Sequence, residues 1–274
     1  ISPDDDGKIR VEYGVDSSTN STNEGVISKI IHTLGILPNP SERVKALVYV
    51  EGNHDVNALK RYSKVLNEHN PDIINLMDSE AIGYVITGGS ALKHYINQKH
   101  LDGLGKPEIH IYDRDVGSYV AAVQKINEEN NPIKVAFNTE KLELENYLHH
   151  EAIVEAYAEN GTQIELAEIQ DQDDVPMLVA KSMNVATNDN WDELTHEKQK
   201  ELSSNKKKSL NTAAVEKMTI ERITERGGYE EIVSWLAEVK RLAVLRISVN
   251  PNGHFGFIRS LFLLLFRPYQ FYLK

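Results

Sequence analysis

The chain of 274 residues contains no cysteine. This absence excludes disulfide bonds and any zinc site built on thiolates, and it agrees with a reducing compartment. The N-terminus has no basic stretch followed by an apolar segment, so no signal or transit peptide is visible. We therefore expect a cytoplasmic protein. The first residue is isoleucine rather than methionine, which suggests a fragment or a processed product.

Positive charge is also scarce. The chain has 30 Lys and Arg residues against 41 Asp and Glu residues, and its net charge at pH 7 is −11. Because basic side chains supply most of the non-specific affinity for nucleic acid, this composition argues against a surface that binds a polynucleotide by charge alone. Any such contact must be local. The acidic composition is compatible with a carboxylate-rich site that binds a hard divalent cation first and a phosphate through it.

Long apolar runs are missing too. The most apolar stretch lies near the C-terminus, where Arg259, Arg267 and Pro268 interrupt it. It falls short of the roughly 20 apolar residues that a membrane-spanning helix needs. We therefore expect no membrane anchor. The apolar tail is expected to pack on this chain, on a partner protein or on a second copy in a homo-oligomer.

Apolar segments of strand length alternate with helical patterns from Ala46 onward. This alternation predicts an α/β fold with a largely parallel sheet whose faces are covered by helices. The strands are expected at 46–50, 83–87, 108–112 and 133–137, and the helices at 55–66, 90–98, 118–129 and 144–158. After about Asp171 the pattern is helical and highly charged. The expected segments are a connector (1–44), an α/β core (45–157), a helical extension (158–245) and an apolar tail (246–274).

Acidic residues follow three of the four predicted strands. Ligand sites of parallel sheets lie at the carboxyl ends of the strands, so these side chains are expected to meet at one edge. Such a group would repel itself strongly unless divalent cations lay among its members. The carboxylates after the first, third and fourth strands are Glu51, Asp55, Asp113, Asp115, Glu143 and Glu145.

Each acidic group also has a simpler interpretation. The acids after the first strand could be favoured by the dipole of a following helix. The acids after the third strand could belong to a solvated turn, and those after the fourth to an exposed helix face. Their joint occurrence at successive strand ends favours the metal site. Similarly, Gly88, Gly89 and Ser90 could cradle a phosphate with backbone N–H groups, or could simply form a tight turn.

Two motifs resemble a known family. "VYVEGNHD" followed by "IYDRD" resembles the E-G-x-x-D and D-x-D signature of TOPRIM domains, and "EKLELENYL" resembles the acidic E-N-Y segment of the OLD (overcoming lysogenization defect) family of endonucleases. The resemblance covers Lys45 to about Tyr157, and more loosely the chain to about Met218. It implies a TOPRIM fold, a small and largely parallel sheet flanked by helices, and metal-dependent phosphodiester chemistry.

The resemblance also implies site residues. The metal site would hold Mg²⁺ or Mn²⁺, with two ions expected, and Glu51 would be a ligand or the general base. Its implied ligands are Glu51, Asp55, Asp113, Asp115 and Glu145, with Glu143 as the alternative to the last. The family also has a lysine beyond a helical insertion, for which Lys206, Lys207 and Lys208 are candidates. Lys208 is preferred because a helix starting there would direct it inward, although the run could also be solvated.

The family usually carries an N-terminal ATPase domain with a G-x-x-x-x-G-K-[ST] loop, and this sequence contains no such loop. We therefore expect either a fragment of a longer ATPase-nuclease or a separate effector that works with an ATPase. The resemblance implies a nuclease acting on DNA or RNA in defence against phages. The alternative is a non-catalytic scaffold or sensor subunit bound to an ATPase.

Overall fold

The computed structural model describes residues 43–88, 106–187 and 190–245, together with the backbone of four short strands. The chain divides into two compact units, Ile1–Ala243 and Val244–Lys274. The short strands form two antiparallel pairs: β1 (Ser2–Pro3) with β2 (Ile9–Arg10), and β7 (Ile247–Val249) with β8 (Phe255–Phe257). The rest of the expected connector, the helix expected at 90–98 and the rest of the apolar tail lie outside the described residues.

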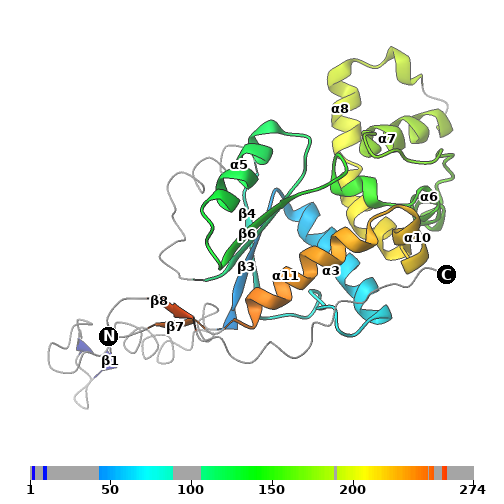
Figure 1. The fold of residues 1–274 in the computed structure, drawn as a ribbon. Helices are drawn as coiled ribbons and strands as arrows, with labels where there is room; N and C mark the ends of the chain where they lie inside the picture. The colour runs from blue at the N-terminus through cyan, green and yellow to red at the C-terminus, as the bar shows by residue number, and fades with distance from the viewer. Residues whose placement is uncertain are drawn as a thin grey trace. The chain divides into compact units, whose positions relative to one another are not determined.

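A four-stranded parallel sheet forms the centre of the first unit (Figure 1). Its strand order is β4-β3-β5-β6, and each neighbouring pair is parallel. The bounds are Ala46–Val50 for β3, Ile82–Ile86 for β4, Glu108–Tyr112 for β5 and Lys134–Asn138 for β6. The predicted α/β fold with a parallel sheet is thus confirmed, with the two edge strands shifted by one residue.

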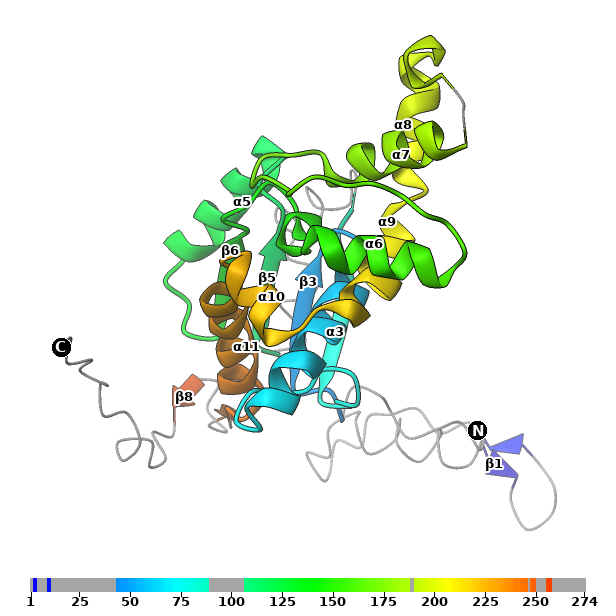
Figure 2. The same ribbon diagram turned by 90° about the vertical axis from the view of Figure 1, so that its right-hand side faces the viewer.

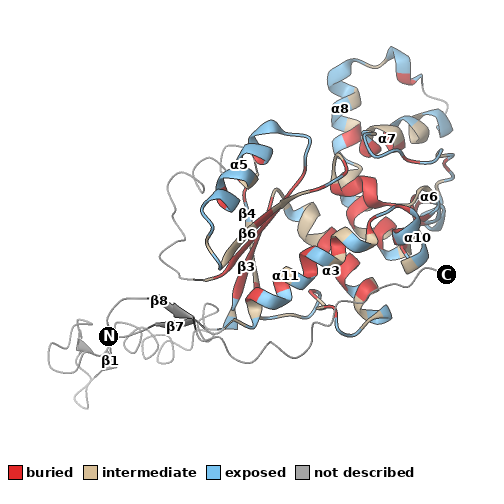
Figure 3. Ribbon diagram, in the orientation of Figure 1, coloured by how far each residue is buried: buried red, intermediate tan, exposed pale blue. Residues whose placement is uncertain are grey.

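The two central strands, β3 and β5, are buried along their whole length, whereas the edge strands are partly exposed (Figure 3). Parallel strands covered on both faces read as continuous apolar runs, as "ALVYV" does. Helices α3 (Asn53–His69) and α11 (Tyr229–Ala243) cover one face, and α5 (Gly117–Glu128) covers the other. The last long helix therefore returns to pack beside the first.

Helix α3 begins directly after β3. Gly52 is its N-cap residue, and the Asp55 carboxylate accepts a hydrogen bond of 2.8 Å from the Gly52 N–H. This contact satisfies a backbone donor that the first turn cannot pair. Leu59, Tyr62 and Leu66, spaced three and four residues apart, are buried against the sheet and the following helices, which anchors the helix along one face.

The predicted helical region after the sheet is confirmed. Helices α7 (Val175–Ala186) and α8 (His196–Ser204) pack against each other away from the sheet (Figure 2). A π-helical turn, η4 (Leu210–Ala214), packs against α3 and α6 (His150–Glu159). No described helix has the length and apolar character needed to span a membrane. The other elements of this region are η3 (Trp191–Glu193), α9 (Lys207–Ser209), η5 (Val215–Lys217) and α10 (Ile220–Glu225).

One expected helix is broken. The continuous helix predicted for 144–158 was wrong, because a short 3₁₀ helix, η2 (Leu144–Tyr147), is separated from α6 by the extended Leu148. The Asn146 side chain explains the break. It accepts a hydrogen bond from the Glu143 N–H and donates to the backbone carbonyls of Gln170 and Asp173. Side-chain bonds of this kind compete with a continuous helix.

Candidate metal centre

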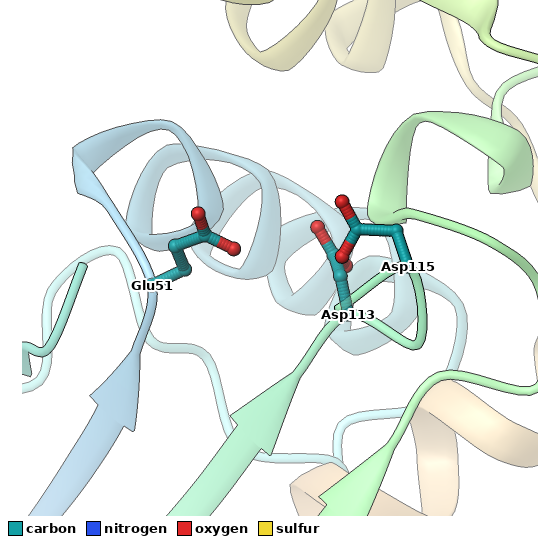
Figure 4. Close-up of side chains that lie close together, drawn as sticks. All are labelled: Glu51, Asp113 and Asp115. Atoms are coloured by element: carbon teal, nitrogen blue, oxygen red, sulfur yellow. The ribbon is translucent and has the colours of Figure 1, made fainter. Parts of the chain in front are cut away.

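Three carboxylates meet at the carboxyl edge of the two central strands. Glu51 follows β3, and Asp113 and Asp115 follow β5. One carboxylate oxygen from each lies within 4.8 Å of the others, and all three side chains face the same space (Figure 4). The two strands are neighbours in the sheet, so residues far apart in the sequence meet at this edge. The expected convergence of these three side chains is what the structure shows.

Asp113 is the most enclosed member of this trio, with 5% of its surface exposed. Its Oδ1 atom accepts a hydrogen bond of 3.0 Å from the Leu144 N–H, and the Asn138 side chain donates to its backbone carbonyl. Burial, and then the charges of Asp55 and Glu145, raise the pKa of Asp113 well above its usual value. The strand end is therefore tied to the loop that carries the next acidic residues.

Two further acids surround the trio. Burial raises the pKa of Asp55 to about 7, and the charges of Glu145 and Glu51 add to the effect against the hydrogen bond from Gly52. Glu145, on η2, is 2% exposed, and its Oε1 accepts a hydrogen bond of 2.7 Å from the Asn211 side chain. The structure thus places Asp55 and Glu145 in the electrostatic field of the trio.

Glu143 occupies a different position from Glu145. Its Oε2 atom lies 3.1 Å from Lys207 Nζ. Burial, followed by the charge of Glu145, raises the pKa of Glu143 to about 7, although Lys207 opposes the shift. Glu145, held by a neutral amide, remains the better candidate ligand, whereas Glu143 holds the lysine.

The segment that carries both glutamates is held in place by buried contacts. Asn146 has no exposed surface, and its side chain donates hydrogen bonds of 2.9 Å to two backbone carbonyls of the 170–173 segment. Arg226 donates to the Asn146 backbone carbonyl at 2.7 Å and also contacts Asp171. Such anchoring limits how far the acidic side chains can move apart despite their mutual repulsion.

The lysine that faces the carboxylates is Lys207. Burial by itself would lower its pKa, but the charges of Glu145 and Glu143 outweigh burial and raise the pKa above the usual value. Lys208 is exposed, and Lys206 is half-buried with a pKa lowered by burial. The inward orientation expected for Lys208 was therefore wrong. Adjacent side chains of a helix point about 100° apart, so only one member of the run can face the centre.

The glycine-rich stretch after β4 has a packing role at the one position that the structure describes. A Cβ atom on Gly88 would lie 2.6 Å from the backbone oxygen of Glu51. The absence of a side chain thus allows the ends of β3 and β4 to approach closely. Gly89 and Ser90, the other candidate phosphate-binding residues, lie outside the described residues.

Sequence reasoning missed two neighbours of the centre. Asn211 contacts Glu145, and Tyr119 lies beside Glu51. Burial, followed by the charge of Asp115, raises the pKa of Glu51, although the charge of Lys207 and a hydrogen bond with Tyr119 act in the opposite direction. Neither residue belongs to a motif. Tyr119 occupies a helix position that is typical of core packing, and a single asparagine in a helical pattern carries no signal of its own.

The donor set fits a hard divalent cation. All the side chains of the trio offer carboxylate oxygens, which Mg²⁺ and related ions prefer, and no sulfur or ring nitrogen is among them. Burial also raises the pKa of Asp115, so each member of the trio binds its proton more tightly than usual. Burial is the main cause of these raised pKa values, and repulsion between the acids adds to it. A cation among the oxygens would offset both effects by favouring the charged carboxylates.

No family model matches the chain, and no curated protein matches it. Among solved structures, the chain is similar to the C-terminal region of the Xanthomonas campestris pv. campestris OLD protein, phased with iodine in one structure and with platinum in another. The identity is 16%, and the TM-scores are 0.38 and 0.39. The matches cover 72% and 74% of this chain and 98% and 99% of the Xanthomonas chains, which bear the name of the family that the sequence motifs resemble.

Proposed function

We propose that the chain is a divalent-metal-dependent nuclease that hydrolyses phosphodiester bonds of DNA or RNA. The observation that carries the proposal is the convergence of Glu51, Asp113 and Asp115 at one strand edge, with oxygen atoms within 4.8 Å of one another. A protein with a purely structural role gains nothing from holding like charges together, because each buried charge costs free energy. A cation site explains why these carboxylates are kept.

The residues of the trio would hold one Mg²⁺ or Mn²⁺ ion, and Asp55 and Glu145 extend the donor set toward a second. When bound, such ions polarise the scissile phosphate and lower the pKa of an attacking water. Glu51 is then a ligand or the general base that accepts the proton of that water. Glu51 suits either role because it is less buried than Asp113.

Lys207 would place positive charge beside the reacting phosphate. Its ammonium group lies 3.1 Å from Glu143, so it is held at the rim of the cluster rather than extended into solvent. A cation in a fixed position stabilises negative charge that grows in the transition state without needing to reorganise. Lys207 therefore replaces Lys208 as the catalytic lysine of the proposal.

The motifs that resemble the OLD family support a proposal about the biological role and the partner of the chain. The proposal extends to an OLD-like TOPRIM effector in antiviral defence that works in the cytoplasm with an ATPase domain or subunit. It includes the domain division expected from the sequence, in which the 158–245 region completes the 45–157 core. It also includes assembly of the chain as a homo-oligomer. The Asn211 and Lys207 contacts to the acidic loop support that division, because they join the two regions at the site.

A cleavage assay tests the proposal. The full chain, with and without its neighbouring ATPase, is incubated with plasmid DNA and with tRNA in the presence of Mn²⁺ or of a chelator. We expect metal-dependent cleavage that Glu51→Gln lowers at least about 100-fold, since it removes a charge and keeps the shape. Glu128→Gln, an exposed change on α5, should cleave like the wild type. A wild type that is inactive on both substrates would favour the scaffold or sensor role.

A further inference from the structure

Asn211 makes two contacts that connect the helical region to the acidic loop. It lies on the π-helical turn η4 and is 1% exposed. Its side-chain nitrogen Nδ2 donates a hydrogen bond of 2.7 Å to Glu145 Oε1 and another of 3.0 Å to the backbone carbonyl of Lys207. A buried side chain with both of its N–H groups used in this way has one orientation available to it.

The chemistry of the partners assigns the amide orientation. A carboxylate and a backbone carbonyl only accept hydrogen bonds, so the nitrogen of the amide, not its oxygen, must face both of them. The contact to Lys207 fixes the amide with respect to the helix backbone. The contact to Glu145 then fixes the carboxylate with respect to the amide. One oxygen of Glu145, Oε1, is held in this way.

The local backbone explains how Asn211 and Lys207 come to face the same side. They lie four residues apart, at neighbouring positions on a helical surface. A π-helical turn follows the single α-helical turn α9, and Leu210 and Ala214 are buried there without exposed surface. Such wide turns are rare and occur often at functional sites. Here α9 brings the Lys207 cation to Glu143, and the π turn that follows brings the Asn211 amide to Glu145.

We propose that Asn211 is a positioning residue of the metal centre, which orients the Glu145 carboxylate for cation binding through the hydrogen bond to Oε1. This inference rests on the proposed metal site. A neutral amide suits the role because it holds the carboxylate without competing with the cation for its charge. Removal of such an indirect partner lowers the affinity for a metal by about 10- to 100-fold.

Measurement of Mn²⁺ affinity tests this role without any need for activity. Calorimetric titration of the full chain, with bound Mn²⁺ counted by electron paramagnetic resonance, is compared for the wild type, Asn211→Leu and Thr212→Val. Leucine keeps the volume but removes both donors, so we expect Mn²⁺ binding at least about 10-fold weaker. Thr212 is on the same π turn and donates to the Lys208 carbonyl, away from the acidic loop. Thr212→Val should bind Mn²⁺ like the wild type.

A double-mutant cycle separates positioning from general damage. In a Glu145→Gln background, Asn211→Leu should cause no further loss of Mn²⁺ affinity, because the carboxylate that it orients is gone. If Asn211→Leu is not folded by circular dichroism, Asn211→Ser, which is smaller and keeps one donor, takes its place with a smaller expected loss.

The outcomes distinguish the two proposals. A wild type that binds no Mn²⁺ would overturn the proposed function together with this inference. A wild type that binds Mn²⁺, with an Asn211 variant of equal affinity, would overturn the positioning role alone. A full loss that persists in the Glu145→Gln background would also overturn it, since Asn211 would then support the fold rather than the carboxylate.

Discussion

Two groups of buried charge lie at opposite ends of the same strand, β5. At its amino end, Glu108 contacts Lys134 Nζ at 3.2 Å and His110 Nε2 at 3.3 Å. At its carboxyl end, Asp113 meets Glu51 and other carboxylates. The first group compensates its acid with a base from the neighbouring strand. In the second, the acids outnumber Lys207, the lysine that faces them among the described residues.

The acid at the amino end is paired by side chains of the same chain, whereas the proposed partner of the acids at the carboxyl end is a bound cation. The ring of His110 lies between acceptor and donor groups, because Nε2–H faces Glu108 and Nδ1 accepts from the Tyr112 hydroxyl at 3.0 Å. Burial lowers the pKa of His110, and its ring stacks on Tyr49 with centroids 4.1 Å apart. The charge and hydrogen-bond partners of Glu108 and His110 are thus side chains of the chain itself. Among the described residues, the acids at the other end are faced by Lys207, and the proposed cation would supply further positive charge.

The largest expected effect comes from removal of one acid at each end. Glu108→Gln breaks a buried ion pair and leaves Lys134 without its carboxylate, so we expect the free energy of unfolding to fall by roughly 3 kcal/mol, with or without Mg²⁺. Asp113→Asn relieves repulsion, so the metal-free protein should keep or gain stability and lose most of the stabilisation by Mg²⁺. Urea unfolding of both variants, without Mg²⁺ and with Mg²⁺, measures these changes in the free energy of unfolding. If both variants lost the same free energy of unfolding and responded equally to Mg²⁺, the proposed difference between the two ends of β5 would be contradicted.

A smaller effect is expected from the two neighbouring lysines. Lys207→Met should lower nuclease activity about 100-fold, because it removes the fixed cation beside the carboxylates. Lys208→Met, which changes an exposed side chain one residue away, is the matched control and should stay within about twofold, as most surface changes do. The comparison is made on kcat at saturating Mn²⁺. A larger loss for Lys208→Met than for Lys207→Met would restore the lysine expected from the sequence.

The smallest effect is a dependence of stability on pH. The pKa values of Asp55 and Glu143 are raised to about 7 in the folded protein, so the folded state binds more protons than the unfolded chain between about pH 4 and 7. The contribution of these two groups to the stability of the metal-free protein should therefore be greatest below about pH 4 and decrease as the pH rises from 4 toward 7. Thermal midpoints between pH 5 and 8 measure the trend.

Mg²⁺ at a saturating concentration should reverse this trend, because it replaces the protons that the carboxylates release. The Asp55→Asn variant is the control, since it removes one of the two groups and should flatten the metal-free profile. A metal-free midpoint that rises from pH 5 to 7 in the wild type, and equally in the variant, would contradict the raised pKa values.

Much of the site could be predicted because its residues follow directly from the strands. A carboxylate that comes immediately after a buried parallel strand lies at the carboxyl edge whatever the rest of the fold does. Glu51 and Asp113 are in this position, Asp115 follows two residues after Asp113, and the structure brings the three together as expected. Helix α3, expected over 55–66, begins two residues earlier at Asn53, because Gly52 is its N-cap residue and Asp55 accepts a hydrogen bond from the Gly52 N–H.

The remaining features depended on contacts between distant segments. The helix expected through 144–158 is broken because Asn146 bonds to a segment more than 20 residues away, which no local pattern reports. The orientation of the 206–208 lysines depends on where a short α-helical turn gives way to a π turn. A shift of one residue there rotates each side chain by about 100°, so local patterns could not select among the three.

The sequence by itself determined the parallel α/β sheet and the acids at its strand ends, because hydrophobic periodicity and strand termini are local properties of the chain. Only the tertiary structure decided that Lys207 faces those acids and that Asn211 holds Glu145. Both residues reach the site from a helical region that is more than 60 residues beyond the acidic loop, and their placement follows from the packing of η4 against α3 and α6. Packing of that kind depends on the shapes of surfaces that form only when the chain is folded.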